Sequence, residues 1–578
     1  MYIQTKSGLD TPVAVTSPPT SSAPTSTAAQ VEQPHLSHRK TVTHQDLFSE
    51  LKQAIHWKQC SAAFKAICLQ TFAFAERALE AKLAKDPHAQ VNLVLDIDDC
   101  LVECSSFFAG MMDSDETMTP ERNNEWWKNA QKKQSTPLPG ALKFINKFKD
   151  NPRVHITYLT SRGNPEGIEQ WTIDMLKELG FPLADAGHVR VSNPSTGRKP
   201  DHVKAIKEKN GIQECLLMGD KLSDFGEPCP KDHDNRRKWV HERKEKWGRD
   251  YIVMPNPVYG MWENLTHDMG KIDYQEKKAT RDSSLRQDIS FTTSSAKDDP
   301  VKARETLQGL HYVQSPAYDA YMLQLSNIAK DMAKEKQMTT RSSAVVFDID
   351  GTLLSNSPWR ARLCFDGKSG TQDSFNDWAQ KQDAEAIVGM RELVNELRHQ
   401  GYQIYFVTNR PSKLRESDRE ETLRKATEQE LQGKGFMSGH DKLIMREDGN
   451  PSIEADQPAP RDKASRMQAI RDGEFNRGQR TNIKMFFGDA MKDLDIAPKE
   501  MHQGTEDNWS KSITGSMGQC CFLCPNPPFS KGWLTHYVEW AREKGIETEI
   551  VDGKSLADRT IKHWHLSDNC LVLQKEAA

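Results

Sequence analysis

The chain has 578 residues, of which 78 are basic and 82 acidic, so its formal net charge is -4. This length corresponds to roughly two to four domains of ordinary size. The near balance of charge excludes a global electrostatic case for binding nucleic acid or an anionic membrane. The eleven cysteines are scattered and odd in number, and we interpret them as reduced thiols.

Residues 1–45 form the first predicted segment, a tail rich in Ser, Thr and Pro that contains TSPPTSSAPTSTAA. Such a composition holds too few large apolar side chains to fold, so we expect this tail to be disordered. The start lacks the basic segment and apolar core of a secretory signal, and no lipoprotein leader precedes Cys60, the first cysteine. We therefore expect a protein that is cytoplasmic as synthesised, with leaderless secretion left open.

Residues 46–270 read as the first α/β domain. A helical pattern from His56, HWKQCSAAFKAICLQTFAFAERALEAK, precedes the apolar run VNLVL, which ends in Asp96, Asp98 and Asp99. Next come the helical pattern PGALKFINKFKD and the apolar run VHITYLT, which ends at Thr160. Alternating short β-branched runs and longer helical patterns favour a parallel sheet with helices on both faces.

A second copy of this domain is predicted over residues 301–545, after a polar linker at 271–300 and before a C-terminal extension at 546–578. SAVVFDIDGTLL repeats the first acidic strand end, and Asp348 follows Asp96 by 252 positions (348 minus 96). In the same order, HYVQSPAYDAYMLQ, QIYFVTNR, MFFGDAMKD and CFLCPNPPF repeat stretches of the first copy. Ordered anchors at so long a period predict tandem domains.

The polar residues of each copy follow apolar strands, and ligands of such sheets bind outside the carboxyl ends of the strands. Asp96 and Asp98, two positions apart, are predicted to share Mg²⁺ with Asp220, supported by Asp224. Asp96 would attack phosphorus and carry it as an aspartyl-phosphate, and Asp98 would act as general acid and base. The hydroxyl of Thr160 and the ammonium of Lys199 would point at the place where charge develops on the phosphoryl group. The second copy offers the same set as Asp348, Asp350, Thr408, Lys463, Asp489 and Asp493.

This ordered set resembles the haloacid-dehalogenase (HAD) superfamily of phosphohydrolases. More narrowly, HWKQCSAAFKAI, WWKNA, LPGALKF, LLMGDKLSDFG and MPNPVYGMWE resemble the class C bacterial acid phosphatases, HAD subfamily IIIB, here in tandem. The resemblance implies two HAD-like (Rossmannoid) parallel-sheet domains with small helical caps. It also implies a Mg²⁺-dependent phosphomonoesterase that acts on nucleoside monophosphates or similar small esters.

The first copy departs from the family pattern where Cys100 stands in place of the threonine that the second copy keeps as Thr352. Asp99 has no counterpart, because the second copy has Gly351 there, and we expect it to be a solvated neighbour. Lys199 could exchange roles with Lys204 in the same predicted helix.

Aromatic residues follow the Pro-Asn-Pro turn of the first copy. Tyr259 and Trp262 are predicted to bind substrate by stacking on a nucleobase, while the competing interpretation is a buried aromatic anchor.

The sequence thus predicts a phosphatase that releases phosphate from small phosphomonoesters, with a small phosphorylated molecule as its partner and neither nucleic acid nor membrane. The alternative is a HAD-like binding protein, partly or wholly inactive and delivered as a secreted effector. The exact substrate, the activity of each copy and the oligomeric state stay open.

Overall fold

The computed structural model describes residues 50–112, 120–163, 165–260, 297–298, 305–335, 342–415, 417–448, 463–494, 511–528, 538 and 541–542. All of them lie within one compact body, residues 38–578, and its two halves are called the first and the second unit below. The predicted tail and C-terminal extension lie outside the described residues, and so does the predicted linker apart from residues 297 and 298. The predicted domain boundaries stay a prediction.

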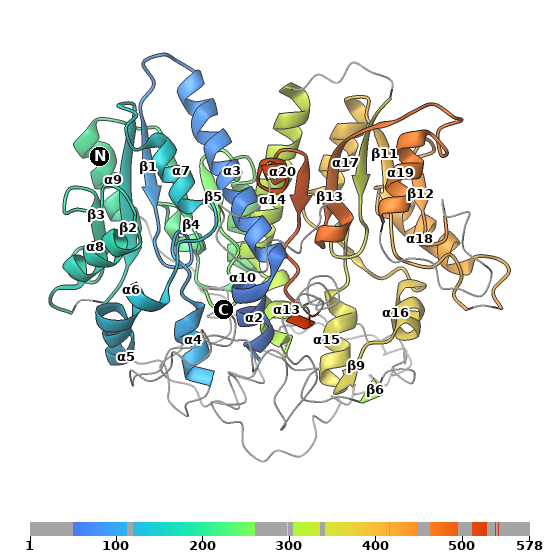
Figure 1. The fold of residues 1–578 in the computed structure, drawn as a ribbon, viewed down its shortest axis with the longest axis horizontal. Coiled ribbons are helices and arrows are strands. Elements are labelled where there is room, and N and C mark those ends of the chain that lie inside the picture. The colour runs from blue at the N-terminus through green and yellow to red at the C-terminus, as the bar shows by residue number, and fades with distance from the viewer. Residues whose placement is uncertain are drawn as a thin grey trace, which may run out of the picture. The chain divides into compact units, whose positions relative to one another are not determined.

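The first half of the chain forms a five-stranded parallel sheet in the order β3-β2-β1-β4-β5. Its elements are α2 (Lys52–Cys60), α3 (Ala62–Ala84), β1 (Val91–Leu95), α4 (Ser105–Met112), α5 (Pro120–Glu125), the π-helical turn η1 (Trp126–Ala130), α6 (Gln131–Gln134), α7 (Ala141–Phe148), β2 (Val154–Ser161), α8 (Ile168–Glu178), β3 (Val189–Ser192), α9 (Lys199–Asn210), β4 (Cys215–Gly219), the 3-10 turn η2 (Leu222–Asp224), α10 (His233–Glu242) and β5 (Tyr251–Val253). Figure 1 shows helices flanking this sheet.

The second half repeats the same strand order as β12-β11-β7-β13-β14, again parallel throughout. Its elements are β6 (Lys297–Asp298), α13 (Leu307–Val313), α14 (Pro316–Glu335), β7 (Ser343–Phe347), β8 (Leu354–Ser355), α15 (Ser357–Phe365), β9 (Lys368–Ser369), α16 (Gln372–Ala379), β10 (Glu385–Ala386), α17 (Met390–His399), β11 (Gln403–Val407), α18 (Thr422–Gly433), β12 (Lys442–Ile444), α19 (Ala464–Asp472), β13 (Asn482–Gly488), the 3-10 turn η4 (Met491–Leu494), α20 (Lys511–Ser516) and β14 (Cys521–Leu523). The prediction of two tandem α/β units is confirmed.

The central strand of each sheet is buried along its whole length. All five residues of β1 and all five of β7 are buried, as expected for parallel strands that are covered on both faces. Short helices are inserted after each central strand, namely α4 to α6 in the first unit and α15 and α16 in the second. The second insertion also carries the antiparallel pair of β8 and β10. These insertions correspond to the predicted caps.

The two units exchange contacts at the edge strands of their sheets. In α3 of the first unit, Gln70 accepts a hydrogen bond from the backbone N–H of Leu523 in β14 (2.7 Å) and donates one to its carbonyl (3.0 Å). In α14 of the second unit, Gln324 does the same to Val253 in β5, at 2.7 and 3.1 Å. On its outer side, the last strand of each sheet thus forms hydrogen bonds with a glutamine from the other unit's helix in place of a further strand.

Two glycines permit these exchanged contacts. A Cβ atom on Gly248 would lie 3.0 Å from the carbonyl oxygen of Gln324, and one on Gly518 would lie 3.1 Å from that of Gln70. Both glycines have positive φ, 81° and 71°, a conformation that side chains other than glycine rarely adopt. The matching positions of the two glycines show that the interface has approximate twofold symmetry.

Replacing Gln324 by Ala is expected to lower the free energy of unfolding by about 2 to 4 kcal/mol, because two buried backbone groups of Val253 lose their partners. Urea denaturation of the full chain measures this. Gln170→Ala is a matched control, since Gln170 is exposed and donates a hydrogen bond to the exposed Asp174 on its own helix. Equal stability of the two variants would contradict the prediction.

Two findings bear on the predicted class of protein. Among the described residues, no helix combines the length and apolar character needed to cross a membrane. The ten cysteines in the described part of the chain are all free thiols, which confirms the expected reduced state for that part.

Candidate active site

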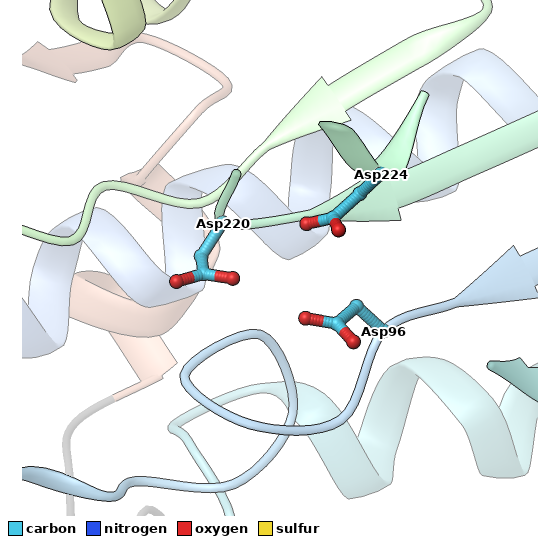
Figure 2. A group of neighbouring side chains, drawn as sticks. All are labelled: Asp96, Asp220 and Asp224. Carbon is cyan, nitrogen blue, oxygen red and sulfur yellow. The ribbon is translucent and has the colours of Figure 1, made fainter. Parts of the chain in front are cut away.

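The carboxyl ends of neighbouring strands bring the acidic residues of the first unit together. Asp96 follows β1, and its backbone N–H donates to Met218 in β4 at 2.9 Å. Asp220 follows β4, and Asp224 closes the 3-10 turn after it. One oxygen from each of these three carboxylates lies within 4.8 Å of the others, and all three residues are buried (Figure 2). The sequence prediction that these residues converge is confirmed.

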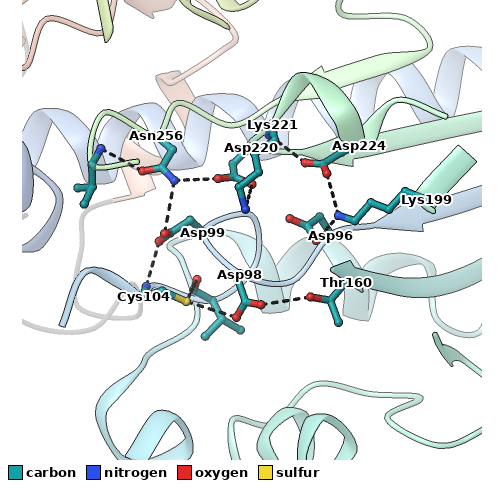
Figure 3. Close-up of polar contacts among 12 residues, drawn as sticks. Asp96, Asp98, Asp99, Cys104, Thr160, Lys199, Asp220, Lys221, Asp224 and Asn256 are labelled. Atoms are coloured by element: carbon teal, nitrogen blue, oxygen red, sulfur yellow. Dashed lines mark hydrogen bonds and ion pairs between the residues drawn. The ribbon is translucent and has the colours of Figure 1, made fainter. Parts of the chain in front are cut away.

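Lys199, the first residue of α9, neutralises part of this cluster. Its ammonium lies 2.5 Å from Oδ1 of Asp96 and 2.8 Å from Oδ1 of Asp224 (Figure 3). Burial alone would lower the pKa of Lys199, but the two carboxylates raise it above its ordinary value, so the ammonium is charged. Burial also raises the pKa of Asp96, against the opposing effect of Lys199. Lys204, the alternative considered from sequence, is exposed and lies 3.9 Å from Glu208.

Asp98 turns away from the cluster and is held by an arginine. Arg162 donates from Nε to Oδ2 at 3.0 Å and from Nη2 to Oδ1 at 2.8 Å. Gln131 and Thr160 add hydrogen bonds of 2.6 and 3.1 Å. Burial would raise the pKa of Asp98, but Arg162 and Gln131 lower it to about 2. Thr160 therefore lies where the sequence placed it, although its hydroxyl contacts Asp98 in this structure.

The second unit repeats the arrangement. Lys463, which precedes α19, pairs with Asp348 and lies 2.8 Å from Asp493. Burial raises the pKa of Asp348 to about 7, while Lys463 acts to lower it. Asp489 joins Asp348 and Asp493 in a second cluster of carboxylates, again within 4.8 Å. Asn526 donates to Oδ2 of Asp489 at 2.6 Å, as Asn256 does to Asp220 at 2.7 Å.

Asp350 is also clamped by an arginine. Arg410 donates from Nε at 2.9 Å and from Nη2 at 2.8 Å to the two oxygens of Asp350. Its remaining Nη1 donates to Glu430 at 3.1 Å, so the buried guanidinium joins two carboxylates. Thr408 is buried, and its hydroxyl accepts from the backbone N–H of Arg410 at 3.1 Å. The threonine kept only in the second unit, Thr352, donates to Asp348 at 3.2 Å.

The donor chemistry of both clusters fits a divalent cation such as Mg²⁺, which prefers carboxylate oxygens. In the first unit, Oδ1 of Asp220 is buried and has no hydrogen-bond partner among the described residues, which is consistent with a cation ligand. The sequence predicted Asp98 as the third carboxylate of the first cluster and Asp350 as that of the second. In the structure the third carboxylates are instead Asp224 and Asp493, which were predicted as supporting acids. Metal ligation by Asp98 and Asp350 stays a prediction, because their side-chain oxygens are engaged by the arginines.

Asp99 is not the solvated neighbour that the sequence suggested, and that prediction is wrong. Its side chain is fully buried and forms an ion pair with Lys58 of α2. Asp99 also accepts from the backbone N–H of Cys104 at 3.0 Å, and its φ of 57° is tolerated by aspartate more readily than by most residues. Lys58 stands where the repeated stretch of the second copy has Val313, so the buried charge and its partner both belong to the first copy alone.

Of the two aromatic residues predicted to bind substrate, only Tyr259 lies among the described residues. Its ring stacks on Phe108 with the centroids 4.6 Å apart, and the ammonium of Lys221 lies 4.7 Å from its centroid. It is half-buried, near Asp220 and Asp99. Substrate binding by Tyr259 stays a prediction, and Trp262 lies outside the described residues.

Sequence reasoning missed the two arginines. Arg162 and Arg410 each stand two positions after the predicted threonine, in YLTSR and FVTNR. The recurrence of this spacing in both copies was the available signal. It also missed Gln131 and Glu430, which no local pattern marks, because they reach the arginines from separate helices.

Comparison with known proteins finds a family model that matches both halves of the chain and relatives that cover part of it. The family model of the HAD superfamily, subfamily IIIB (acid phosphatase), matches residues 13–262 and 275–531. The chain is similar to "Acid phosphatase 1" of Solanum lycopersicum, with 24% identity over 219 residues, 38% of this chain and 71% of that protein. Among solved structures it is similar to the class C acid phosphatase of Bacillus anthracis, with 26% identity and a TM-score of 0.38 over 42% of this chain and 98% of that one. The same values hold for that enzyme with tungstate bound.

Proposed function

Because the chain belongs to the acid phosphatases of HAD subfamily IIIB and is a phosphatase, we propose that it hydrolyses small phosphomonoesters through an aspartyl-phosphate. We further propose that the reaction depends on Mg²⁺ and that nucleoside monophosphates are among the substrates. The observation that carries this proposal is the pairing of Asp348 with Lys463 at a strand end, beside Asp489 and repeated in the first unit.

In the proposed first step, an oxygen of Asp348 bonds to phosphorus while the bond from phosphorus to the ester oxygen breaks. Asp350, after taking up a proton, transfers it to the leaving alcohol. Arg410 donates hydrogen bonds to both oxygens of Asp350, so the proton transfer requires substrate binding to loosen this clamp. Lys463 neutralises the negative charge around the phosphoryl group, and the bound cation would supply Lewis-acid stabilisation of its oxygens.

In the proposed second step, Asp350 accepts a proton from water, whose oxygen attacks the phosphorus of the aspartyl-phosphate. The bond to the Asp348 oxygen breaks, which releases inorganic phosphate and restores the carboxylate. Asp96, Asp98 and Lys199 could perform the same steps in the first unit. There Cys100 lacks the hydroxyl that Thr352 directs to Asp348, so the nucleophile Asp96 lacks this hydrogen bond.

The proposal is tested by phosphate release from p-nitrophenyl phosphate and a panel of nucleoside monophosphates, before and after metal removal with EDTA and restoration of Mg²⁺. Activity that survives metal removal would contradict the metal requirement. Mass spectrometry of acid-quenched turnover should find a phosphoryl group on Asp348 that hydroxylamine removes. An adduct on another residue, or no phosphate release, would contradict the mechanism.

In the Asp348→Asn background, where the remaining turnover comes from the first unit, replacing Tyr259 by Leu is expected to raise KM for nucleoside monophosphates by roughly tenfold, because base stacking on an aromatic ring contributes about 1–3 kcal/mol. The kinetics with β-glycerophosphate, which has no aromatic group, should change little, and the ratio of the two kcat/KM values is the measurement. Equal losses with both substrates would show that Tyr259 is a structural anchor stacked on Phe108.

A further inference from the structure

The two carboxylate clusters differ at the residue after the aspartate that follows the fourth strand. That residue is Lys221 in the first unit and Ala490 in the second. The two turns share a hydrogen bond, because the N–H of Lys221 donates to Asp224 at 2.9 Å and the N–H of Ala490 donates to Asp493 at 3.0 Å. The lysine side chain is therefore an addition to an otherwise matched turn.

The Lys221 side chain runs back into the cluster. Its ammonium lies 3.9 Å from Oδ1 of Asp220, the buried oxygen that has no hydrogen-bond partner in the described part of the chain. Figure 3 shows the Lys221 ammonium beside Asp220, on the side of the loop that carries Asp96 and Asp98. The Tyr259 ring lies 4.7 Å away and provides a further favourable contact for the cation. Only a quarter of the side chain is exposed.

The space beside the acidic pair also differs between the units. In the second unit, a Cβ atom on Gly351 would lie 2.6 Å from Oδ2 of Asp489, so glycine keeps that space open. In the first unit the same position holds Asp99, which is buried and 3.5 Å from Nδ2 of Asn256. The first cluster therefore has Asp99 on its loop and the ammonium of Lys221 in addition to that of Lys199, whereas the second cluster has Gly351 and Ala490 at the matching positions.

We propose that Lys221 is a built-in cation of the first carboxylate cluster that competes with a divalent metal ion, so that the second cluster binds the metal at least tenfold more tightly. A positive charge about 4 Å from a ligand oxygen satisfies the carboxylate and repels an arriving divalent cation. The inference rests on the proposed function in one respect, since it takes both clusters as sites for a divalent cation.

The inference is tested with Mn²⁺, an oxygen-seeking ion whose free form is counted by electron paramagnetic resonance. The full chain is stripped of metal and titrated, without substrate, as wild type and as single variants. Wild type is expected to bind one Mn²⁺ tightly, Asp489→Asn none tightly, and Lys221→Ala two. Lys204→Ala is the matched control, because it removes an exposed lysine from the same unit and should leave one tight site.

The reciprocal variant Ala490→Lys should weaken the tight site at least tenfold, with its fold checked by circular dichroism and its melting temperature. Two equally tight sites in the wild type, or a Lys221→Ala variant that binds as the wild type does, would overturn the inference and leave the proposed function intact. A Lys221→Ala variant that loses affinity for inorganic phosphate and keeps wild-type Mn²⁺ binding would also overturn it, and would identify Lys221 as a phosphate ligand. No Mn²⁺ binding by any variant would instead overturn the metal requirement of the proposed function.

Discussion

The Asp348→Asn substitution is expected to lower the kcat of the full chain at least about 1,000-fold. Without the catalytic nucleophile, the remaining rate acceleration comes from substrate binding and charge neutralisation alone. Unfolding is not expected to cause the loss. Burial raises the pKa of Asp348, so a neutral amide suits this position, and Lys463 keeps its 2.8 Å contact with Asp493. Steady-state kinetics with p-nitrophenyl phosphate, together with urea denaturation, separates the two effects.

Asp96→Asn is the matched variant in the first unit, and its effect on kcat is expected to be much smaller. Lys221 lies against the first cluster, and Cys100 replaces the hydroxyl there, so this unit should contribute little of the turnover. A large loss from Asp96→Asn with little loss from Asp348→Asn would reverse the assignment of the working unit. Full activity of the double variant would contradict both carboxylates as nucleophiles.

The Arg410→Met variant is expected to be destabilised by about 3–5 kcal/mol, because a buried guanidinium that joins two carboxylates is removed and the carboxylates stay behind. The side chains of Arg410 and Glu430 are almost completely buried, and that of Asp350 is mostly buried. Burial already raises the pKa of Glu430 with Arg410 present, and removal of the arginine should raise it further. The loss of stability should therefore shrink as the pH falls toward the ordinary range of glutamate, where the folded variant binds a proton.

Urea denaturation of Arg410→Met at several pH values measures both effects. Arg415→Met is the control, because Arg415 is exposed and forms a long ion pair of 4.0 Å with Asp377. Such surface pairs contribute about 0–1 kcal/mol to the free energy of unfolding. A loss in Arg410→Met that equals the loss in the control, or that does not depend on pH, would contradict the prediction. The same variant should also lose phosphatase activity, since Asp350 would no longer be held in place.

The strand-end residues could be predicted from sequence because the chain itself determines where they go. Once VNLVL is a central parallel strand, Asp96 must lie at its carboxyl edge, and LLMG brings Asp220 to the same edge. The lysines were predictable because each lies at the start of a helix that begins at this edge, and the repeat supplied a second instance of every position.

Residues whose role depends on distant partners could not be predicted. Asp99 looked like a surface residue because nothing near it in sequence carries a positive charge, and Lys58 comes from a helix 41 positions earlier. Gln70 and Gln324 each stand inside a helix, and their partners belong to the other unit's sheet. The local pattern of a helix shows which positions are apolar, but it does not show which strand of another unit will lie across them.

The exchanged glutamines have a consequence for how the two sites could diverge. In a symmetric pair of separate identical chains, every substitution appears at both sites at once, so one that impairs catalysis impairs it twice. Here two copies with a nearly twofold interface are covalently linked, and Lys221 and Asp99 occur in one copy only. Because Gln70 of α3 binds the edge strand of the second sheet, the first copy supports the fold of the second whatever happens to its own chemistry. Selection on folding therefore preserves a domain whose catalytic residues are free to acquire a different task.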